Sequence, residues 1–376
     1  MKKVIECSHA IAEAVKLCKP AVIPMFPITP QTHIVERLAD FINEGSLDSE
    51  MIHVESEHSA MSAAIGSSAA GTRTFTATNS QGLLLMSEMV FVASGMRLPI
   101  VMAIANRAVS SPINIWCDHS DSMAVRDSGW IQLYCESTQE AFDTIIQAFK
   151  VAEKTFLPAM VCVDGFSLTH VWEPADILSS KEVDKFLPKY KPMFSLDPKK
   201  PVTMGPIAFP NTYQDFKKQQ HDAMKESLKE IVDVNKEFKS KFNRSYGNGL
   251  IETYKMDDAK IVYVCMGSLC TTVRGVIDDY RKKGKKVGMI KIKCFRPFPT
   301  ENILDVTKDV ENLLVIDKAV SLGNEPIVFN EIKSALYGKN IKLRSYVAGL
   351  GGRDVTHYML RKALEDKDKG GEEWLG

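Results

Sequence analysis

The chain has 376 residues, a length that predicts two or three domains rather than one. Lysine plus arginine and aspartate plus glutamate balance at 47 each, so charge gives no reason to expect a nucleic-acid or anionic-membrane partner. The eight cysteines contain no CxxC pair, which argues against an iron–sulfur or zinc cluster in this chain and favours reduced core cysteines of a cytoplasmic protein.

The first residues, MKKVIECSHAIAEAVKLC, do not form a signal peptide, because Glu6, His9 and Glu13 interrupt any apolar run. No apolar run reaches the roughly 18 residues that a membrane-spanning helix needs. We therefore expect a soluble protein without a membrane partner.

Hydrophobic periodicity predicts alternating helices and strands over the first part of the chain. The expected helices cover 8–18, 31–43, 59–70, 83–95 and 138–156. The expected strands cover 21–26, 51–56, 74–78, 98–105, 130–135 and 158–165, with NSQG (79–82) as a turn. Because the strands are continuous apolar runs, the pattern predicts a parallel sheet with helices on both faces. The helix over 83–95 is nearly all apolar and is expected to be buried on most sides.

The residue composition of the sequence changes at about residue 171. Repeated prolines up to residue 210 are expected to prevent regular elements, and 211–242 reads as a Lys-rich amphipathic helix that packs on a neighbour. A second α/β rhythm follows, with expected helices at 271–284 and 326–336 and strands at 259–267, 287–295, 312–317 and 341–347. The sequence thus predicts an α/β domain (1–170), a connector with a helix (171–255) and a smaller α/β domain (256–376).

Polar residues collect where the predicted strands of the first domain end, namely Pro27–Thr29, Glu57, Asn79–Gln81 and Arg107. Ligands of parallel sheets bind at this carboxyl edge, so the convergence predicts a site. Glu57 could hold a ligand, although a charge on the following helix dipole explains its position as well. Arg107 suits a carboxylate or phosphate, or equally an ion pair with Asp118 or Asp121.

Several other motifs give weaker evidence of a binding site. The loop CDHSD (117–121) contains metal-capable groups without a recognised ligand spacing, so a hydrogen-bonded loop is expected. GLGGRD (349–354) reads as a turn, and no glycine-rich phosphate loop is present. VDG (163–165) is too short for the magnesium and diphosphate signature of thiamine enzymes.

The motifs FPITPQT, VESEHSAMSAAIGSSAAGTRTFTATNSQGLLLM, INIWCDHSD and GLGGRDVT resemble the alpha subunit of the multi-subunit pyruvate:ferredoxin oxidoreductase family. The resemblance covers essentially the whole chain. It implies a parallel-sheet domain that binds the pyrimidine of thiamine diphosphate, followed by a smaller α/β domain similar to transketolase carboxyl-terminal domains.

The implied reaction is oxidative decarboxylation of pyruvate with coenzyme A to acetyl-CoA and CO2, with reduction of ferredoxin, and it is reversible. Thiamine diphosphate would be shared with a beta subunit that supplies Mg²⁺, the diphosphate half and a 4Fe–4S cluster. Gamma- and delta-type, ferredoxin-like subunits would complete the complex. Relatives acting on 2-oxoisovalerate share most motifs, and the DHSD loop and Trp116 favour pyruvate. A non-catalytic assembly scaffold is the alternative outside enzymes.

The resemblance also assigns roles to residues of this chain. Glu57 matches the glutamate that hydrogen-bonds the aminopyrimidine and favours its imino form, while Thr29 and Arg107 match contacts of the 2-oxoacid. Further implied contacts are Pro27, Ser80 and Gln81 for the cofactor, and Asp118 and His119 for the substrate. No residue of this chain is expected to bind the metal.

Overall fold

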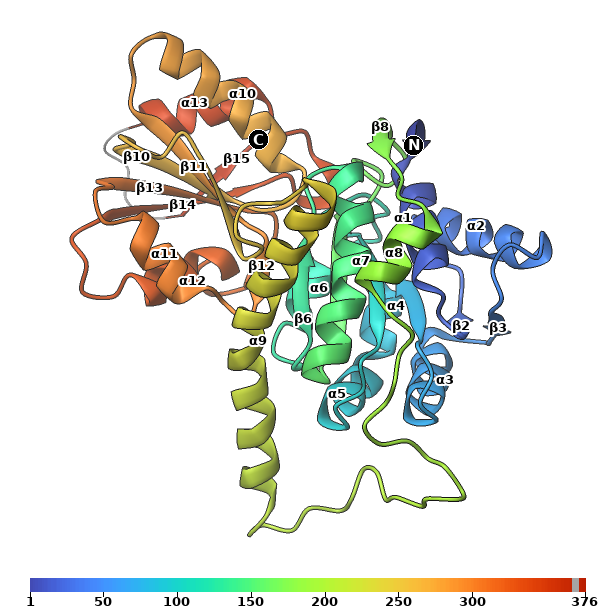
Figure 1. The fold of residues 1–376 in the computed structure, drawn as a ribbon. Helices are drawn as coiled ribbons and strands as arrows, with labels where there is room; N and C mark the ends of the chain where they lie inside the picture. Colours follow the sequence, from blue (N-terminus) through green and yellow to red (C-terminus); the bar gives the residue numbers. More distant parts are fainter. Residues whose placement is uncertain (367–371) are drawn as a thin grey trace.

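The computed structural model describes residues 1–366 and 372–376 and consists of two α/β bodies joined by a long helix (Figure 1). The helices of the amino-terminal body are α1 (Cys7–Cys18), α2 (Thr32–Asn43), α3 (Glu57–Ala69), α4 (Ser80–Leu85), α5 (Ser87–Gly95), α6 (Ser120–Ala124), α7 (Thr138–Thr155) and α8 (Ser180–Phe186). Its strands are β1 (Lys2–Glu6), β2 (Val22–Met25), β3 (Glu50–His53), β4 (Phe75–Thr78), β5 (Val101–Asn106), β6 (Ile131–Tyr134), β7 (Ala159–Asp164) and β8 (Trp172–Asp176).

The main sheet of this body has the order β12-β6-β7-β5-β4, in which β4 to β7 run parallel and β12 (Cys294–Arg296) comes from the later part of the chain. β2 and β3 form a parallel pair beside it, linked by a bridge between Val22 and Thr74. The strands are buried apolar segments, as crossover helices on both faces require. The prediction of a parallel α/β domain is confirmed.

The carboxyl-terminal body is built on a six-stranded sheet of order β15-β14-β13-β10-β11-β9. Its strands are β9 (Ile251–Tyr254), β10 (Ile261–Cys265), β11 (Val287–Ile292), β13 (Asn312–Asp317), β14 (Lys342–Ala348) and β15 (Glu372–Leu375). Its helices are α10 (Leu269–Lys282), α11 (Thr300–Val306), α12 (Ile327–Ala335), α13 (His357–Glu365) and the 3-10 turn η1 (Leu350–Gly352). In Figure 1, α10 and α13 cover one face and α11 and α12 the other.

The two bodies are joined by a strand of the second that pairs with the sheet of the first and by a common hydrophobic core. The expected strand 287–295 is broken, because β11 ends at Ile292 and β12 (Cys294–Arg296) leaves to pair antiparallel with β6. One hydrophobic core holds α3 and α5 against the first sheet and continues through Trp130 and Phe295 into α11 and α12. Each body also has a core of its own, under α1 and α7 in the first and under α10 and α13 in the second.

The segment after residue 170 differs from the prediction, which was wrong to exclude regular elements there. β8 pairs antiparallel with β1, and Pro174 is accommodated because this two-stranded sheet has free edges. α8 follows, and Phe186 enters the first core. The predicted amphipathic helix is confirmed as α9 (Tyr213–Phe242), whose Phe238 is buried in the same core. The division at residues 170 and 255 stays a prediction.

Two further expectations were wrong. NSQG is not a turn, because only Asn79 separates β4 from α4, which begins at Ser80. The expected apolar helix 83–95 is interrupted at Met86, and Leu85 and Phe91 are 55% and 47% exposed rather than buried. These side chains lie on faces of α4 and α5 that the described residues leave partly exposed to solvent. Within the described residues, no helix combines the length and apolarity needed to cross a membrane.

Candidate functional site

The carboxyl edge of the first sheet brings the predicted strand-end residues together. Arg107, directly after β5, donates from Nη1 to the Thr29 carbonyl at 2.9 Å, so the loop after β2 touches the loop after β5. Ser80, the first residue of α4, donates from Oγ to the Ala108 carbonyl at 2.6 Å. Gln81 donates to Ser110 in the same loop. Three loops that are distant in sequence therefore form one surface, as the sequence predicted.

Glu57 is the first residue of α3 and is only 6% exposed. Its carboxylate faces α4, where a β-carbon at Gly82 would lie 2.5 Å from Glu57 Oε1 and 2.6 Å from Thr78 Oγ1. Glycine is needed at position 82 because any side chain would fill this space. Within the described part of the chain, neither the Glu57 carboxylate nor the Thr78 hydroxyl has a hydrogen-bond partner, and the hydroxyl is buried.

The position of Glu57 satisfies both interpretations that the spacing left open. A carboxylate in the first turn of α3 is stabilised by the helix dipole. Buried polar groups are normally hydrogen-bonded, however, and this carboxylate and Thr78 are aimed into one small space beside a glycine. The geometry is therefore that of a buried acid held ready for a ligand with hydrogen-bonding groups.

Ser80 adopts a left-handed backbone conformation, with φ of 47°, which is strained for a residue with a side chain. Asp121 helps to hold it there, because its Oδ2 accepts from the Ser80 N–H at 2.9 Å and from the Arg107 N–H at 3.0 Å. Its Oδ1 accepts from Asn106 Nδ2 at 2.7 Å and from the Ser122 N–H at 2.7 Å. One carboxylate thus ties the ends of β4 and β5 to α6.

The sequence placed Asp121 in an expected hydrogen-bonded loop and offered it as an ion-pair partner of Arg107, but it did not predict these contacts with Ser80 and with the backbone of Arg107. Asp121 is fully buried, and burial raises the pKa of its carboxyl against the opposing effect of the hydrogen bonds from Ser80 and Arg107. The one sequence signal for this role is an acidic residue at the start of a short helix. The neighbouring residues do not reveal that it accepts hydrogen bonds from Arg107 and Ser80, which lie 14 and 41 residues earlier in the chain.

Arg107 is largely buried, and its guanidinium donates to main-chain carbonyls rather than to an acid. Besides Thr29, Nε donates to the Asn114 carbonyl at 2.9 Å. Burial lowers the pKa of the Arg107 guanidinium, and the nearby Asp121 carboxylate opposes this shift. The side-chain ion pair that the sequence left open, with Asp118 or Asp121, is not formed. A guanidinium has five N–H donors, so others remain for a carboxylate.

Asp118 and His119 lie at the seam between the two bodies. Asp118 accepts from the Ser120 N–H at 2.9 Å and from the Gly351 N–H at 3.1 Å. The imidazole of His119 is 1% exposed and its Nε2 lies 2.8 Å from Asp164 Oδ1, at the end of β7. The structure thus engages both side chains in contacts within the chain, and their predicted contact with the substrate stays a prediction.

Asp164 is the centre of the seam cluster. Lys318 Nζ lies 2.7 Å from Asp164 Oδ2 and 3.4 Å from Cys117 Sγ. Burial alone would raise the pKa of Asp164, but Lys318 and His119 together hold it well below its ordinary value. Cys117, His119 and Asp164 are close enough to share a metal ion, yet the lysine ammonium already stands beside two of them. The predicted hydrogen-bonded loop fits this arrangement.

The motif GLGGRD does more than turn the chain. Gly352 has φ of 80° and packs directly on the Trp116 side chain, while its N–H donates to the Cys117 carbonyl at 2.7 Å. Asn114 Nδ2 donates to the Gly351 carbonyl at 3.1 Å. The glycines therefore let η1 press against the loop that also receives Arg107, which is a close approach that three glycines in four residues could have signalled.

A cavity of about 800 Å³ lies elsewhere, between α1, α8 and residues 45–48 and 71–73. Ala21 and Arg73, which line it, precede β2 and β4, so it opens at the amino ends of the strands. Glu57, Thr29 and Arg107 do not line this cavity. Because ligands of parallel sheets bind at the carboxyl ends, we place the candidate site at the Glu57 surface.

Two family models match the chain. Residues 13–236 match the family described as "Pyruvate flavodoxin/ferredoxin oxidoreductase, thiamine diP-bdg". Residues 259–359 match "Pyruvate:ferredoxin oxidoreductase core domain II". The first match contains the whole surface around Glu57 and Arg107.

Curated relatives agree with these models. The chain is 52% identical over 381 residues to "Pyruvate synthase subunit PorA" of Methanocaldococcus jannaschii, covering 100% of this chain and 97% of the relative. It is 47% identical to the subunit of the same name from Thermotoga maritima, covering 96% and 93%. It is 44% identical to "Ketoisovalerate oxidoreductase subunit VorA" of Pyrococcus abyssi, covering 98% and 94%.

A solved structure shares the fold. A chain of 2-oxoglutarate:ferredoxin oxidoreductase from Magnetococcus marinus aligns with a TM-score of 0.76 at 17% identity. The alignment covers 97% of the present chain and 65% of that solved chain, so the present chain spans less than two thirds of its length. Family models over both α/β bodies and full-length relatives near 50% identity lead to one conclusion: the chain belongs to the pyruvate:ferredoxin oxidoreductase family.

Proposed function

We propose that this chain is the alpha-type subunit of a pyruvate:ferredoxin oxidoreductase. The complex would convert pyruvate and coenzyme A to acetyl-CoA and CO2 with reduction of ferredoxin, and would run in reverse as a pyruvate synthase. The observation that carries the proposal is the buried, unpaired carboxylate of Glu57 facing Gly82 and Thr78 within a matched thiamine-diphosphate-binding region. Relatives named pyruvate synthase subunits at 52% and 47% identity support it.

The residues around Glu57 fit the pyrimidine end of thiamine diphosphate. The orphaned carboxylate and hydroxyl supply hydrogen-bonding groups, and the missing side chain at Gly82 supplies space. Pro27, Ser80 and Gln81 would complete the cofactor contacts, with Ser80 held in its strained conformation by Asp121. When bound, thiamine diphosphate supplies the electron sink for decarboxylation.

Within this site Glu57 would share a proton with a ring nitrogen of the cofactor, and its carboxyl would hold the aminopyrimidine in its imino form. Arg107 would pair through its free N–H donors with the carboxylate of the 2-oxoacid, next to Thr29. Asp118 and His119, assigned to the substrate by sequence, would act by holding the loop that carries Asn114 and Trp116 against the second body.

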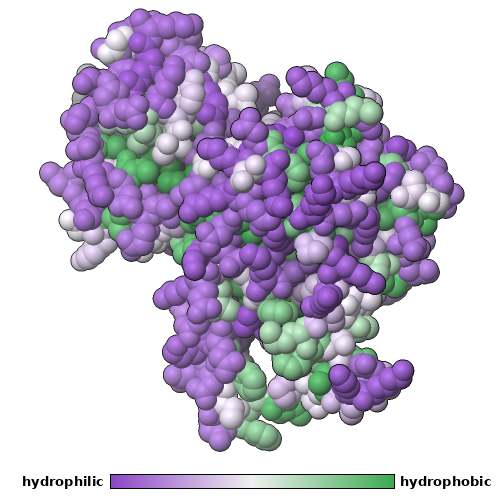
Figure 2. Space-filling model, viewed as in Figure 1, coloured by the Kyte–Doolittle hydropathy of each residue, from purple (hydrophilic) through white to green (hydrophobic). Residues whose placement is uncertain are grey.

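This chain offers only part of a thiamine site, so partner subunits are part of the proposal. A beta-type subunit would provide Mg²⁺, the diphosphate half and a 4Fe–4S cluster, with gamma- and delta-type subunits passing electrons to ferredoxin in the cytoplasm. Exposed apolar side chains support assembly: Figure 2 shows them gathered at the lower end of the molecule, over the start of α9 and the segment before it. They include Met193, Phe194, Ile207, Phe209 and Phe216.

A branched-chain substrate is the nearest alternative, since one relative is named a ketoisovalerate oxidoreductase subunit. Trp116 is 53% exposed and packs on Gly352, and its carbonyl accepts from the N–H of Ala108, the residue after Arg107. An indole in this loop would limit the size of the substrate side chain. We therefore expect pyruvate to be preferred. The scaffold alternative predicts instead that no single side chain of this subunit matters for turnover.

The test is a steady-state assay of the complex purified with its co-expressed partner chains. We expect viologen reduction that requires pyruvate, coenzyme A and thiamine diphosphate together, with a specificity constant for 2-oxoisovalerate at least about 10-fold lower. Both substrates lose CO2 and differ only in the alkyl group on the keto carbon, which is methyl in pyruvate and isopropyl in 2-oxoisovalerate. The ratio of their specificity constants therefore reports the size of the pocket. A preference for 2-oxoisovalerate would overturn the assignment of pyruvate, and turnover without thiamine diphosphate would overturn the proposed chemistry.

A further inference from the structure

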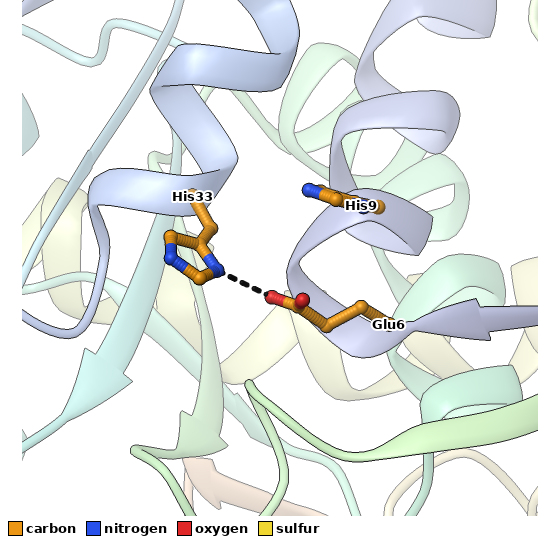
Figure 3. A group of neighbouring side chains, drawn as sticks. All are labelled: Glu6, His9 and His33. Carbon is orange, nitrogen blue, oxygen red and sulfur yellow. Dashed lines mark hydrogen bonds and ion pairs between the residues drawn. The ribbon is translucent and has the colours of Figure 1, made fainter.

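A second group of ligand-type side chains lies outside the candidate site. Glu6 ends β1, His9 lies in the first turn of α1, and His33 lies in the first turn of α2 (Figure 3). Glu6 Oε1 is 2.7 Å from His33 Nδ1. One ligand atom from each of the three residues can be chosen so that all lie within 4.8 Å of one another.

The three side chains point into one shared space. Figure 3 shows the His33 ring turned toward the Glu6 carboxylate, with the His9 ring extending from the neighbouring helix above them. Glu6 is buried, whereas both imidazoles are half-buried, so an ion could reach the group from solvent. The His9 and His33 rings are 6.2 Å apart between centroids.

A simple ion pair between Glu6 and His33 does not explain the whole arrangement. That pair needs only two partners, yet His9 also faces it, and no hydrogen bond of the His9 ring is formed with any described residue. Two imidazoles and a carboxylate are the donor set that proteins use for Zn²⁺ and related ions. The three residues also come from different elements that tertiary packing brings together.

We propose that Glu6, His9 and His33 bind one divalent transition-metal ion, with Zn²⁺ as the representative ion. Three protein ligands leave a fourth position for water in a tetrahedral site. The ion would join the start of α1 to the start of α2, in place of the single Glu6–His33 contact. The site is separate from the thiamine chemistry proposed above and does not depend on it.

The surroundings connect this site to the candidate active site. The His170 ring stacks on His33 at 4.4 Å, Phe166 on His170 at 4.8 Å, and Trp116 follows Phe166 at 6.4 Å. His170 Nδ1 is itself 2.8 Å from Thr169 Oγ1, which fixes its ring. A metal at His33 would therefore brace the loop after β7, against which Trp116 rests.

The experiment is a calorimetric titration of the chelator-treated full chain with Zn²⁺ at neutral pH. We expect one saturable site whose affinity falls at least about 100-fold in His9→Ala and in His33→Ala, and likewise in Glu6→Gln, because each removes a ligand. His53→Ala is the matched control, since His53 is an exposed histidine at the end of β3, and its affinity should equal that of the unchanged chain.

A second readout is the visible absorption of bound Co²⁺, whose intensity reports tetrahedral coordination and should be lost in the same three variants. Circular dichroism of the metal-free proteins shows whether each variant is folded. The proposal is overturned if the unchanged chain shows no saturable Zn²⁺ binding. It is equally overturned if folded His9→Ala and His33→Ala bind Zn²⁺ as tightly as the His53→Ala control.

Discussion

The amino-terminal body has two polar regions that differ in whether their buried charged groups are paired. At its seam with the carboxyl-terminal body, Lys291 is 1% exposed and lies 2.7 Å from Glu140, 2.9 Å from Glu136 and 3.3 Å from Glu252. At the carboxyl edge of the sheet, Glu57 is nearly as buried but has no partner among the described residues.

This difference distinguishes the paired charges around Lys291, which stabilise the fold, from Glu57, which is positioned to bind a ligand. Burial alone would raise the pKa of Glu140, yet Lys291 and Lys293 lower it to about 2, so this acid is fully compensated. A buried charge without compensation costs several kcal/mol and persists only where the surrounding structure imposes it. We therefore expect changes at the seam to affect mainly stability and changes at the edge to affect mainly turnover.

The largest expected effect is at the seam. Lys291→Met should lower the free energy of unfolding by about 3–5 kcal/mol, because it leaves buried carboxylates without their central partner. Urea unfolding of the full chain measures it. Lys308→Met is the control, since the Lys308–Asp305 pair is exposed and its loss should change stability by less than about 1 kcal/mol. Equal effects of the two substitutions would mean that the seam does not hold the bodies together.

Acid should weaken the seam in a defined range of pH. The pKa of Glu140 is about 2 in the folded chain against an ordinary value of 4.5, so its contribution is complete above pH 4.5 and is lost as pH falls toward 2. The full contribution is about 3 kcal/mol. Unfolding free energies measured at intervals from pH 6 to pH 3 should fall more steeply for the unchanged chain than for Glu140→Gln, and parallel curves would contradict this pairing.

At the edge, Asp121→Asn should cost about 2–3 kcal/mol in stability, because the amide cannot accept all four hydrogen bonds that the carboxylate receives. Turnover should fall as well, since Ser80 and Arg107 lose the group that fixes their backbone. Unfolding and steady-state kinetics of the assembled complex measure both effects. Ser122→Ala, which keeps the carboxylate, should leave turnover within a few-fold of the unchanged complex.

The smallest expected effect comes from a change in the contact between η1 and the loop that carries Trp116, at the carboxyl edge of the first sheet. Gly352→Ala should cost about 1–3 kcal/mol and raise the KM for the 2-oxoacid, because a side chain at φ of 80° is strained and pushes Trp116 and its loop outward. Gly338→Ala is the control, since Gly338 has a similar φ of 77° but open space around it. The control should lose some stability and keep its KM, so a raised KM in both variants would refute a specific role of Gly352.

The sequence predicted what depends on local pattern. Apolar runs marked the strands, and their ends marked Glu57 and Arg107, because a parallel sheet places its carboxyl ends at one edge. The helix after β4 was misjudged because Leu85 and Phe91 are apolar yet exposed, and composition does not distinguish a buried face from one that awaits a partner.

Contacts between distant segments could not be predicted in this way. Glu140 and Lys291 are 151 residues apart, and neither is unusual in its own surroundings. The role of Gly82 likewise requires knowing that α3 and α4 place Glu57 and Thr78 on either side of it. The break of the strand 287–295 arises because β12 joins the other body's sheet, which is a tertiary contact and not a local preference.

The central claim is that Glu57 serves the reaction and not the fold, and two single-atom changes two residues apart test it directly. Glu57→Gln and Glu55→Gln should both give intact complexes with their partner chains, since Glu55 is exposed and the Glu57 side chain forms no hydrogen bond or ion pair with the described residues. We predict that pyruvate-dependent turnover falls at least about 100-fold in Glu57→Gln, through loss of the acid–base contact, and is unchanged in Glu55→Gln. Near-normal turnover of an intact Glu57→Gln complex would contradict the account.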